Sequence, residues 1–340
     1  MSEAIDIAVV GATGEVGRAV LAVLAERGFP SGRVYPLASA KSAAGRVEFK
    51  GAQLRVRDLT EFDFSQAQLA FFCTSASVSR AHVPSAAACG CVAIDHSGAF
   101  STDPTVPLVV PEVNRERIGA YRERGILASP GATTVLLAMV LKPLRDAVGI
   151  ERVNVVTFEA VSGSGRAAVE ELAGQTANLL NLKPIRSAVF PKQIAFNVLP
   201  QVGAFQDDGY TEGETRLWSE TRRVLGEEAL PINVTATRVP VFYGHAAVMH
   251  LELRRPLDAA EARACLRETP GLLVLDEPPA HDYPTAVTDG SGGDLIHVAR
   301  VREDASHPRG LDLWALADNL RRGAALNSVG IAEVLVGDYF

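Results

Sequence analysis

A glycine-rich turn near the start of the chain is the feature that most constrains its fold. The apolar, β-branched run Ile5–Val10 leads directly into Gly11-Ala12-Thr13-Gly14-Glu15-Val16-Gly17, and apolar residues then recur at helical spacing as far as Leu24. The helix is expected to stop at Gly28. A strand, a tight turn and a helix in this order are typical of the first unit of a parallel sheet covered by helices.

Short apolar runs between turn residues continue this alternation over the first third of the chain. Those expected to be strands are residues 34–38, 69–73, 92–94 and 125–128. Strands separated by helical patterns indicate a parallel sheet that is buried on both faces.

The pattern changes at about residue 130. Strand-like stretches of alternating polarity follow, as at residues 153–158 and 248–253, and they indicate a mixed or antiparallel sheet with helices on one face. Residues 200–215 are expected to form a loop, and helix is expected again from about residue 319 to residue 335.

A chain of 340 residues is long enough for two domains. The sequence predicts an α/β fold with a Rossmann-like parallel-sheet domain of residues 1–130 plus 313–340. The second predicted domain, residues 131–312, is α+β with a mixed sheet.

Composition limits the partners that the chain is expected to have. The net charge of −7 gives no reason to expect nucleic acid or an anionic membrane. The N-terminus lacks the basic start of a secretion signal, and the strongest apolar run, residues 135–141, is far shorter than the ~20 residues of a membrane span. The four cysteines form no C-x-x-C pair, so no metal site is predicted. We therefore expect a soluble, cytoplasmic protein.

The glycine turn has the chemistry of an anion-binding site. Glycines let the backbone approach a pyrophosphate closely, and the N-terminus of the following helix directs free N–H groups toward it. The spacing G-x-x-G-x-x-G is a variant of the dinucleotide fingerprint, although such a turn can also be only a tight corner. Its position between the first strand and the first helix favours dinucleotide binding.

The end of the second predicted strand bears on the choice between NAD and NADP. An acidic residue there binds the ribose hydroxyls of NAD. This chain has Leu37-Ala38-Ser39-Ala40-Lys41-Ser42, two hydroxyls and a cation without a carboxylate, which suits the 2′-phosphate of NADP. The alternative is that Lys41 is a solvated loop residue.

Several further blocks follow the glycine turn in a fixed order over essentially the whole chain. They are the segment 37–42, Val-Pro-Leu-Val-Val-Pro-Glu-Val-Asn at 106–114, Ala-Val-Ser-Gly-Ser-Gly at 160–165, Arg-Val-Pro-Val at 238–241 with Gly244-His245, and Ala-Asp-Asn-Leu-Arg-Arg-Gly-Ala-Ala at 317–325. Together they resemble the aspartate-semialdehyde dehydrogenases, NADP-dependent enzymes of amino acid biosynthesis. The last two blocks favour this family over the related N-acetyl-glutamyl-phosphate reductases.

The resemblance implies a homodimer whose second domain serves catalysis and dimerisation. It also implies a thioester mechanism, in which a cysteine thiolate attacks the aldehyde, hydride passes to NADP and phosphate releases the acyl group. The proton-transfer histidine of the family matches His245, and the carboxylate-binding arginine matches Arg238. The phosphate-site lysine falls on Arg216. The implied NADP contacts are Gly11, Thr13, Gly14, Glu15, Val16, Lys41, Ser42, Ser162, Gly163 and Asn319.

The positions at which this chain differs from the family are mainly those of the residues that carry out the reaction or bind the substrate. The nucleophilic cysteine position is Ala132, within Ser129-Pro130-Gly131-Ala132, and the glutamine beside the reacting carbonyl is Glu159. An expected arginine is replaced by Ser101, and the substrate-amine glutamate falls on Gly213. This combination indicates a paralogue of the Usg type that lacks the nucleophile.

Three interpretations remain open at this stage. The first is a non-catalytic NADP-binding protein that acts through an unidentified ligand or protein partner. The second is an altered enzyme that reduces a carbonyl with His245 as proton donor, and the third is an active aspartate-semialdehyde dehydrogenase. Glu159 and His245 are either an acid–base pair or an ion pair filling an idle pocket. Thr133, Thr134 and Cys73 are weak candidates for a substitute nucleophile, and Arg321 and Arg322 are interpreted as cations on a solvated helix face.

Overall fold

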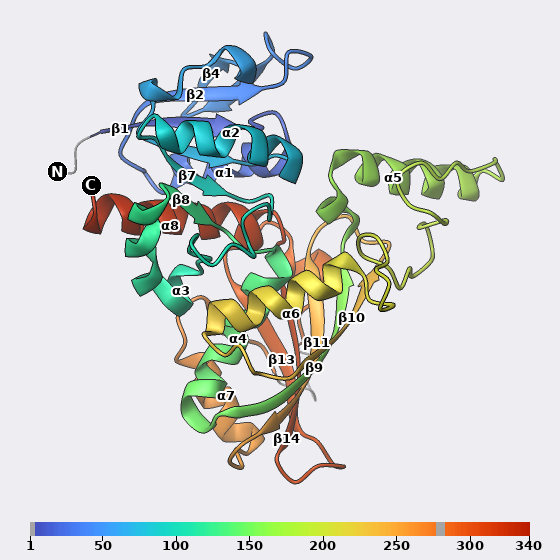
Figure 1. The fold of residues 1–340 in the computed structure, drawn as a ribbon. Helices are drawn as coiled ribbons and strands as arrows, with labels where there is room; N and C mark the ends of the chain where they lie inside the picture. Colours follow the sequence, from blue (N-terminus) through green and yellow to red (C-terminus); the bar gives the residue numbers. More distant parts are fainter. Residues whose placement is uncertain (1–3, 277–282) are drawn as a thin grey trace. The chain divides into compact units, whose positions relative to one another are not determined.

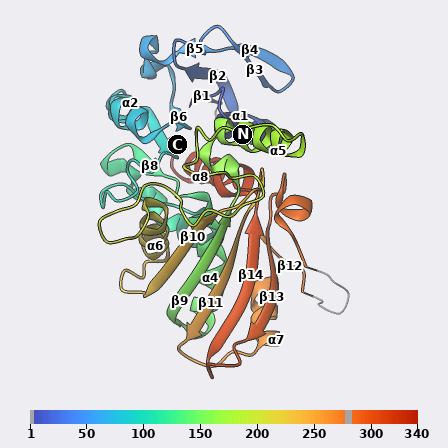
Figure 2. The same cartoon turned by 90° about the vertical axis from the view of Figure 1, so that its right-hand side faces the viewer.

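A computed structural model of the chain describes residues 4–276 and 283–340, so the first three residues of the N-terminal segment lie outside the described part. The chain divides into two compact units, Met1–Gly131 with Ala324–Phe340, and Ala132–Gly323. The elements of each unit can be followed in Figure 1 and, turned by 90°, in Figure 2.

The first unit is built on a six-stranded sheet in the order β5-β2-β1-β6-β7-β8, in which every paired strand is parallel. Its strands are β1 (Ile5–Val10), β2 (Ser31–Ala38), β5 (Arg57–Asp58), β6 (Leu69–Phe72), β7 (Val92–Asp95) and β8 (Ile126–Ala128). Its α-helices are α1 (Glu15–Glu26), α2 (Ala76–Ala88), α3 (Pro111–Asn114) and α8 (Leu326–Asp338), and β3 (Arg46–Phe49) with β4 (Ala52–Arg55) forms a separate hairpin.

The core of this unit explains why these segments form strands. β1 and β6 are almost completely buried, as expected for central strands of a parallel sheet, and α1 contributes its apolar stripe from Val20 to Leu24. The predicted parallel-sheet domain with its strands at these positions is therefore confirmed.

The second unit has a six-stranded mixed sheet in the order β10-β9-β11-β14-β13-β12. Its strands are β9 (Ile150–Glu159), β10 (Ile232–Arg238), β11 (His245–Leu253), β12 (Leu272–Val274), β13 (Ile296–Glu303) and β14 (Gly310–Ala317). The helices are α4 (Ala132–Val148), α5 (Arg166–Leu180), α6 (Glu212–Leu225) and α7 (Ala259–Arg267). Helix α4 packs with α6 and α7 and contacts three central strands, so one face of the sheet is covered (Figure 2). The predicted mixed sheet is confirmed.

Three boundaries differ from the expectation, and one of them is the end of the loop predicted at residues 200–215, since α6 already begins at Glu212. The chain returns to the first unit at Ala324 and not at residue 313, because β14 pairs along its length with β11 and β13 and so belongs to the second sheet. The last α-helix begins at Leu326 and not near residue 319, since Asp318 accepts hydrogen bonds from the N–H groups of Leu320 and Arg321 and holds a turn there.

No helix in the described part of the chain is long and apolar enough to cross a membrane.

Candidate functional site

The glycine turn of the first unit leaves several backbone amides unused. Gly11 has a φ of +81°, and a Cβ there would lie 2.3 Å from the carbonyl oxygen of Cys73, so only glycine fits. Gly11 and Ala12 donate their N–H groups to the carbonyl of Leu37. The amides of the next predicted contacts, Thr13, Glu15 and Val16, have no hydrogen-bond partner among the described residues.

Helix α1 begins within this turn, and its N-cap, Gly14, provides no side-chain cap. The first-turn N–H groups of a helix carry the positive end of its dipole and bind phosphate oxygens well. The turn can therefore hold the pyrophosphate of a dinucleotide.

The segment after β2 keeps the features that were singled out for a 2′-phosphate. Lys41 is exposed and forms no ion pair with any residue of the described part, and the N–H of Ser42 donates to the carbonyl of Ser39 (2.8 Å). These two residues and the glycine turn belong to the same unit.

In the second unit, three strand ends meet at one edge of the sheet. β9 and β10 are parallel and in a register that sets Arg238 opposite Glu159, so both strands end there. β11 is antiparallel to β9 and begins with His245 at that edge. The topology thus places the last residue of two strands beside the first residue of a third.

The side chains of these three residues form a tight, nearly buried cluster. Glu159 Oε2 lies 3.4 Å from Arg238 Nη1 and 3.8 Å from His245 Nε2. Arg238 is 4% exposed and His245 is 5% exposed. Arg238 also donates to the carbonyl of Ala160 (2.7 Å), which fixes the guanidinium beside the carboxylate.

Ala132 lies next to this cluster, because the following residue, Thr133, is hydrogen-bonded to Glu159. Helix α4 begins at Ala132, and the hydroxyl of Thr133 donates to Glu159 Oε1 (3.2 Å). The position expected for a nucleophile is therefore at a helix N-terminus, one residue from a side chain bonded to Glu159. Its side chain is a methyl group.

The protonation of His245 follows from its surroundings. The pKa of His245 is lowered from 6.5 to about 4; burial is the largest cause, the Glu159 carboxylate opposes it, and Arg238 adds to the lowering. The N–H of Ala160 donates to His245 Nδ1 (3.1 Å), so the imidazole proton is on Nε2, which faces Glu159. At neutral pH this histidine is uncharged.

The predicted contacts Ser162, Gly163 and Asn319 also lie at this edge. A Cβ on Gly163 would be 2.9 Å from Arg238 Nη1 and 3.0 Å from His245 Nε2, so a larger residue would displace the cluster. The amide of Asn319 donates to the hydroxyl of Ser162 (3.0 Å) and accepts from the N–H of Gly244 (2.9 Å), directly before His245. The structure therefore brings these three residues together with His245.

Arg216 is held by a residue that the sequence did not single out. Its Nε is 2.6 Å from Glu220 Oε1, and Glu220 is 1% exposed. The other oxygen of Glu220 accepts from the hydroxyl of Thr134 (2.8 Å), so α6 and the first turn of α4 are connected. The signal available in the sequence was the Arg216–Glu220 spacing of four residues on one helix.

The other residues that differ from the family pattern form hydrogen bonds within their own unit. In the first unit, the Ser101 hydroxyl donates to the carbonyl of Gly98 (3.1 Å), and Ser129 accepts from Asn327 (2.9 Å). In the second, the N–H of Gly213 donates to the carbonyl of Val202 (2.9 Å).

Arg322 does not lie on a solvated helix face. It is 1% exposed and contacts the sulfur of Met139 inside the second unit. Residues 321–325 form a single π-helical turn before α8, and Arg322 is buried within this turn.

Cys265, in the second unit, does not replace the missing thiol. Cys265 interacts electrostatically with Asp146, near the C-terminal end of α4. Asp146 follows Ala132 by 14 residues of that helix, which corresponds to about 21 Å. In the first unit, burial and Asp95 raise the pKa of Cys73, so its thiol stays protonated and unreactive.

Comparisons with known proteins agree with this arrangement. Residues 6–121 match the family described as "Semialdehyde dehydrogenase, NAD binding domain", and residues 141–322 match "Semialdehyde dehydrogenase, dimerisation domain". The chain is 48% identical over 340 residues to the aspartate-semialdehyde dehydrogenase of Shewanella violacea, with 100% of both chains covered. It is 43% identical over 339 residues to the "USG-1 protein homolog" of Pseudomonas aeruginosa, again with 100% of both chains covered.

Among solved structures, aspartate semialdehyde dehydrogenase II of Vibrio cholerae, "complexed with ASA", matches with a TM-score of 0.98 and 46% identity over 100% of both chains. Two family models cover most of the chain, and full-length relatives exceed 40% identity. The chain belongs to the aspartate-semialdehyde dehydrogenase family.

Proposed function

We propose that this protein is an NADP-binding member of the family that does not carry out the cysteine–thioester reaction. The observation that carries the proposal is Ala132 at the start of α4, beside the Glu159–Arg238–His245 cluster. A methyl group cannot attack an aldehyde, and loss of a covalent nucleophile removes most of the rate of such a reaction.

The charges of the cluster also argue against the family substrate. By the resemblance, Arg238 corresponds to the residue that binds the substrate carboxylate, and here Glu159 lies 3.4 Å from it. A ligand carboxylate at this position would approach a second carboxylate. The protein is therefore expected to act by binding, as a cytoplasmic homodimer built through the segment that matches the dimerisation domain.

A second candidate function is carbonyl reduction with His245 as the proton donor. The observation in its favour is the nearly buried His245 beside Glu159. However, a pKa of about 4 leaves His245 neutral at pH 7, and a neutral imidazole is a very weak acid. We therefore rank this function below binding.

A steady-state assay tests the proposal directly. The protein is incubated with aspartate 4-semialdehyde, phosphate and NADP while NADPH is followed by absorbance, with the Vibrio cholerae relative as positive control. We expect a rate at least about a thousandfold below the control. A rate within about tenfold of the control would refute the proposal.

The Ala132→Cys variant tests whether the pocket, and not the thiol alone, has changed. We expect it to remain at least about a hundredfold below the control, since Glu159 and Ser101 still differ from the family. Ala132→Ser is the matched variant, because it has similar size but no thiol. Robust activity in Ala132→Cys alone would show that the rest of the site is intact.

A further inference from the structure

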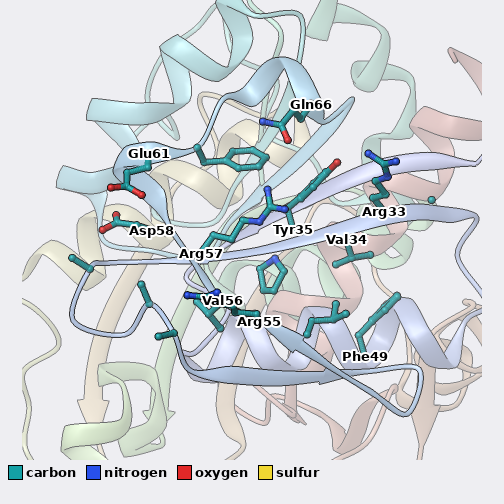
Figure 3. A pocket seen from close by; sticks show the side chains of 17 residues that line it. Arg33, Val34, Tyr35, Phe49, Arg55, Val56, Arg57, Asp58, Glu61 and Gln66 are labelled. Atoms are coloured by element: carbon teal, nitrogen blue, oxygen red, sulfur yellow. The ribbon is translucent and has the colours of Figure 1, made fainter.

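Charge does not select a ligand in the groove beside β2 of the first unit, which has a volume of about 1020 Å³. Figure 3 shows Arg33 at one end of this groove, Arg57 near the middle, and the carboxylates of Asp58 and Glu61 together at the other end. A groove with side chains of both signs favours neither anions nor cations. A more selective arrangement surrounds Asp318 in the second unit.

Asp318 directly follows β14 and is 5% exposed. Its Oδ1 accepts from the N–H groups of Leu320 (2.8 Å) and Arg321 (2.7 Å), and its Oδ2 accepts from the N–H of Gly292 (2.6 Å). Hydrogen bonds to a carboxylate are stronger than those to a neutral acceptor. This one side chain therefore fixes two segments of backbone, the turn at residues 318–321 and the segment that contains Gly292.

The second of these, which we call the 285–292 segment, packs against the start of β11. It contains a single π-helical turn, Ala286–Gly290. The carbonyl oxygen of Ala286 lies 2.6 Å from the place that a Cβ on Gly244 would take, so the two backbones are in direct contact. Gly244 precedes His245, the first residue of β11. The segment therefore supports the backbone that leads into His245.

The residue after Asp318 holds Gly244 through its N–H group. Asn319 Oδ1 accepts from the N–H of Gly244 (2.9 Å), and Asn319 Nδ2 donates to the hydroxyl of Ser162 (3.0 Å). Asn319 is 4% exposed, and the second N–H of its amide has no partner among the described residues. Gly244 thus contacts both Asn319 and the 285–292 segment, and Asp318 fixes both of them.

A second link between the two segments is exposed. The guanidinium of Arg321 pairs with Asp294, whose side chain is 47% exposed. Exposed ion pairs contribute little to stability, whereas loss of a hydrogen bond to a buried charged group costs considerably more. The position of the 285–292 segment therefore depends mainly on Asp318.

The expected NADP contacts divide between the two units in a way that separates the halves of the cofactor. In the first unit, the glycine turn suits the pyrophosphate and Lys41 suits the 2′-phosphate of the adenosine half. By the resemblance, Ser162, Gly163 and Asn319 of the second unit also contact NADP. The part of the cofactor that remains for them is the nicotinamide half, whose carboxamide oxygen and ribose hydroxyls can accept the second N–H of Asn319.

We propose that Asp318 is a positioning residue for the nicotinamide half of NADP. By holding both Asn319 and the 285–292 segment, it keeps the amide of Asn319 and the backbone before His245 in place for the cofactor. Asp318 itself acts through these neighbours, because both of its carboxylate oxygens accept from backbone N–H groups. The inference rests on the proposed NADP binding, and it does not depend on the loss of the thioester reaction.

Asp318→Asn breaks one of the two links selectively. The introduced side chain can still accept from Leu320 and Arg321 through its oxygen, but its NH₂ group cannot accept from Gly292. Calorimetry on the full chain gives the affinities for NADP and for 2′,5′-ADP, which lacks the nicotinamide half. We expect the variant to bind NADP at least about fivefold more weakly, and 2′,5′-ADP within about twofold of the wild type.

Asp294→Asn is the matched control, since it removes only the exposed link between the same two segments. It should change neither affinity by more than about twofold.

Hydrogen exchange followed by NMR measures the positioning without any cofactor. In Asp318→Asn the amide of Gly292 loses its acceptor and should exchange faster. The amide of Gly244 keeps its own acceptor, yet it should exchange at least about fivefold faster, because the 285–292 segment no longer supports it. Amides in the middle of β9 serve as the internal reference and should not change.

Three results would overturn the inference. They are an unchanged affinity for NADP in Asp318→Asn, an unchanged exchange rate at Gly244, and an equal weakening of NADP and 2′,5′-ADP, which would identify a general structural role. The wild type is measured in the same series. If it binds neither nucleotide, NADP binding itself is refuted and the inference falls with it, whereas a failure in the variant alone leaves NADP binding intact.

Discussion

The Glu159 carboxylate lies beside two basic side chains, Arg238 and His245. The carboxylate compensates the positive charge of Arg238. His245 lies beside both residues and stays uncharged mainly because it is buried. A glutamine at position 159 would leave Arg238 uncompensated and remove the only carboxylate within 4 Å of His245 Nε2 in the described part of the chain. The substitution therefore changes the electrostatics of the whole cluster and not of one residue.

Glu159→Gln is expected to lower the pKa of His245 below its value of about 4, because the Glu159 carboxylate is the largest effect that raises it. The measurement is a pH titration of the His245 Cε1–H resonance by NMR. His245→Gln identifies that resonance by its disappearance. An unchanged or higher pKa in Glu159→Gln would contradict the geometry of the cluster.

The same shift makes stability depend on pH. Between pH 6.5 and pH 4 the unfolded chain protonates this histidine and the folded chain does not, so the free energy of unfolding falls as the pH falls through this window. The full contribution of His245 is about 3 kcal/mol. The free energy of unfolding should therefore be lower by about that amount at pH 4 than at pH 7. Comparing urea unfolding of the wild type and His245→Gln at both pH values isolates it. An equal pH dependence in the two proteins would show that His245 does not cause it.

At the scale of elements, two helices of the second unit begin with a capping box, one of them buried and the other on the surface. In α6, Thr211 and Glu214 form a capping box, and Glu214 Oε1 also accepts from the N–H of Ala236 in β10 (2.9 Å). In α7, Asp258 and Glu261 form an equivalent box on the surface. The first box is buried and connects a helix to a strand, whereas the second serves only its own helix.

Glu214→Ala should therefore destabilise the protein more than Glu261→Ala. We expect a loss of about 2–4 kcal/mol for Glu214→Ala, because it leaves a buried strand amide without its acceptor, and about 0.5–1 kcal/mol for Glu261→Ala. The midpoint of urea unfolding, at constant slope, measures both. Equal losses would mean that the bond to Ala236 contributes little.

Local patterns explain which elements were predictable. The strands of the first sheet are short apolar runs bounded by turns, and each pattern is complete within a few residues. The domain boundary at residue 313 was misplaced because the pairing of β14 with β11, which is distant in sequence, keeps β14 in the second sheet. Arg322 was assigned to the surface for a similar reason, since its contact with Met139 spans 183 residues.

In the site, too, features set by local sequence were predictable, and features set by contacts between distant residues were not. The glycine turn was recognisable from its sequence because strand, turn and helix are adjacent. The nearness of Glu159, Arg238 and His245 was expected only from the resemblance, since it depends on the pairing of three strands. Glu220 was missed because its burial depends on how α6 packs against α4.

On the scale of the whole molecule, the two units carry different parts of the expected machinery. The first has the glycine turn with Lys41, and the second has Ala132 with the Glu159 cluster. The departures from the family in the second unit do not touch the turn, whose unused amides are set by the first sheet alone. Cofactor binding is therefore expected to persist although the thioester reaction is lost.

NADP should stabilise the folded protein, and the choice between NADP and NAD should depend on Lys41. At a hundred times its Kd the cofactor raises the free energy of unfolding by about 2.7 kcal/mol, which a thermal shift detects, and calorimetry gives the affinity. Lys41→Ala is expected to weaken NADP binding about tenfold and to leave NAD unchanged, because only NADP places a phosphate on that side chain. Lys192→Ala removes another exposed lysine, in the second unit, and should affect neither cofactor. If Lys41→Ala weakens both cofactors equally, Lys41 supports the loop and does not select the phosphate, and if neither cofactor binds the wild type, the turn is only a tight corner.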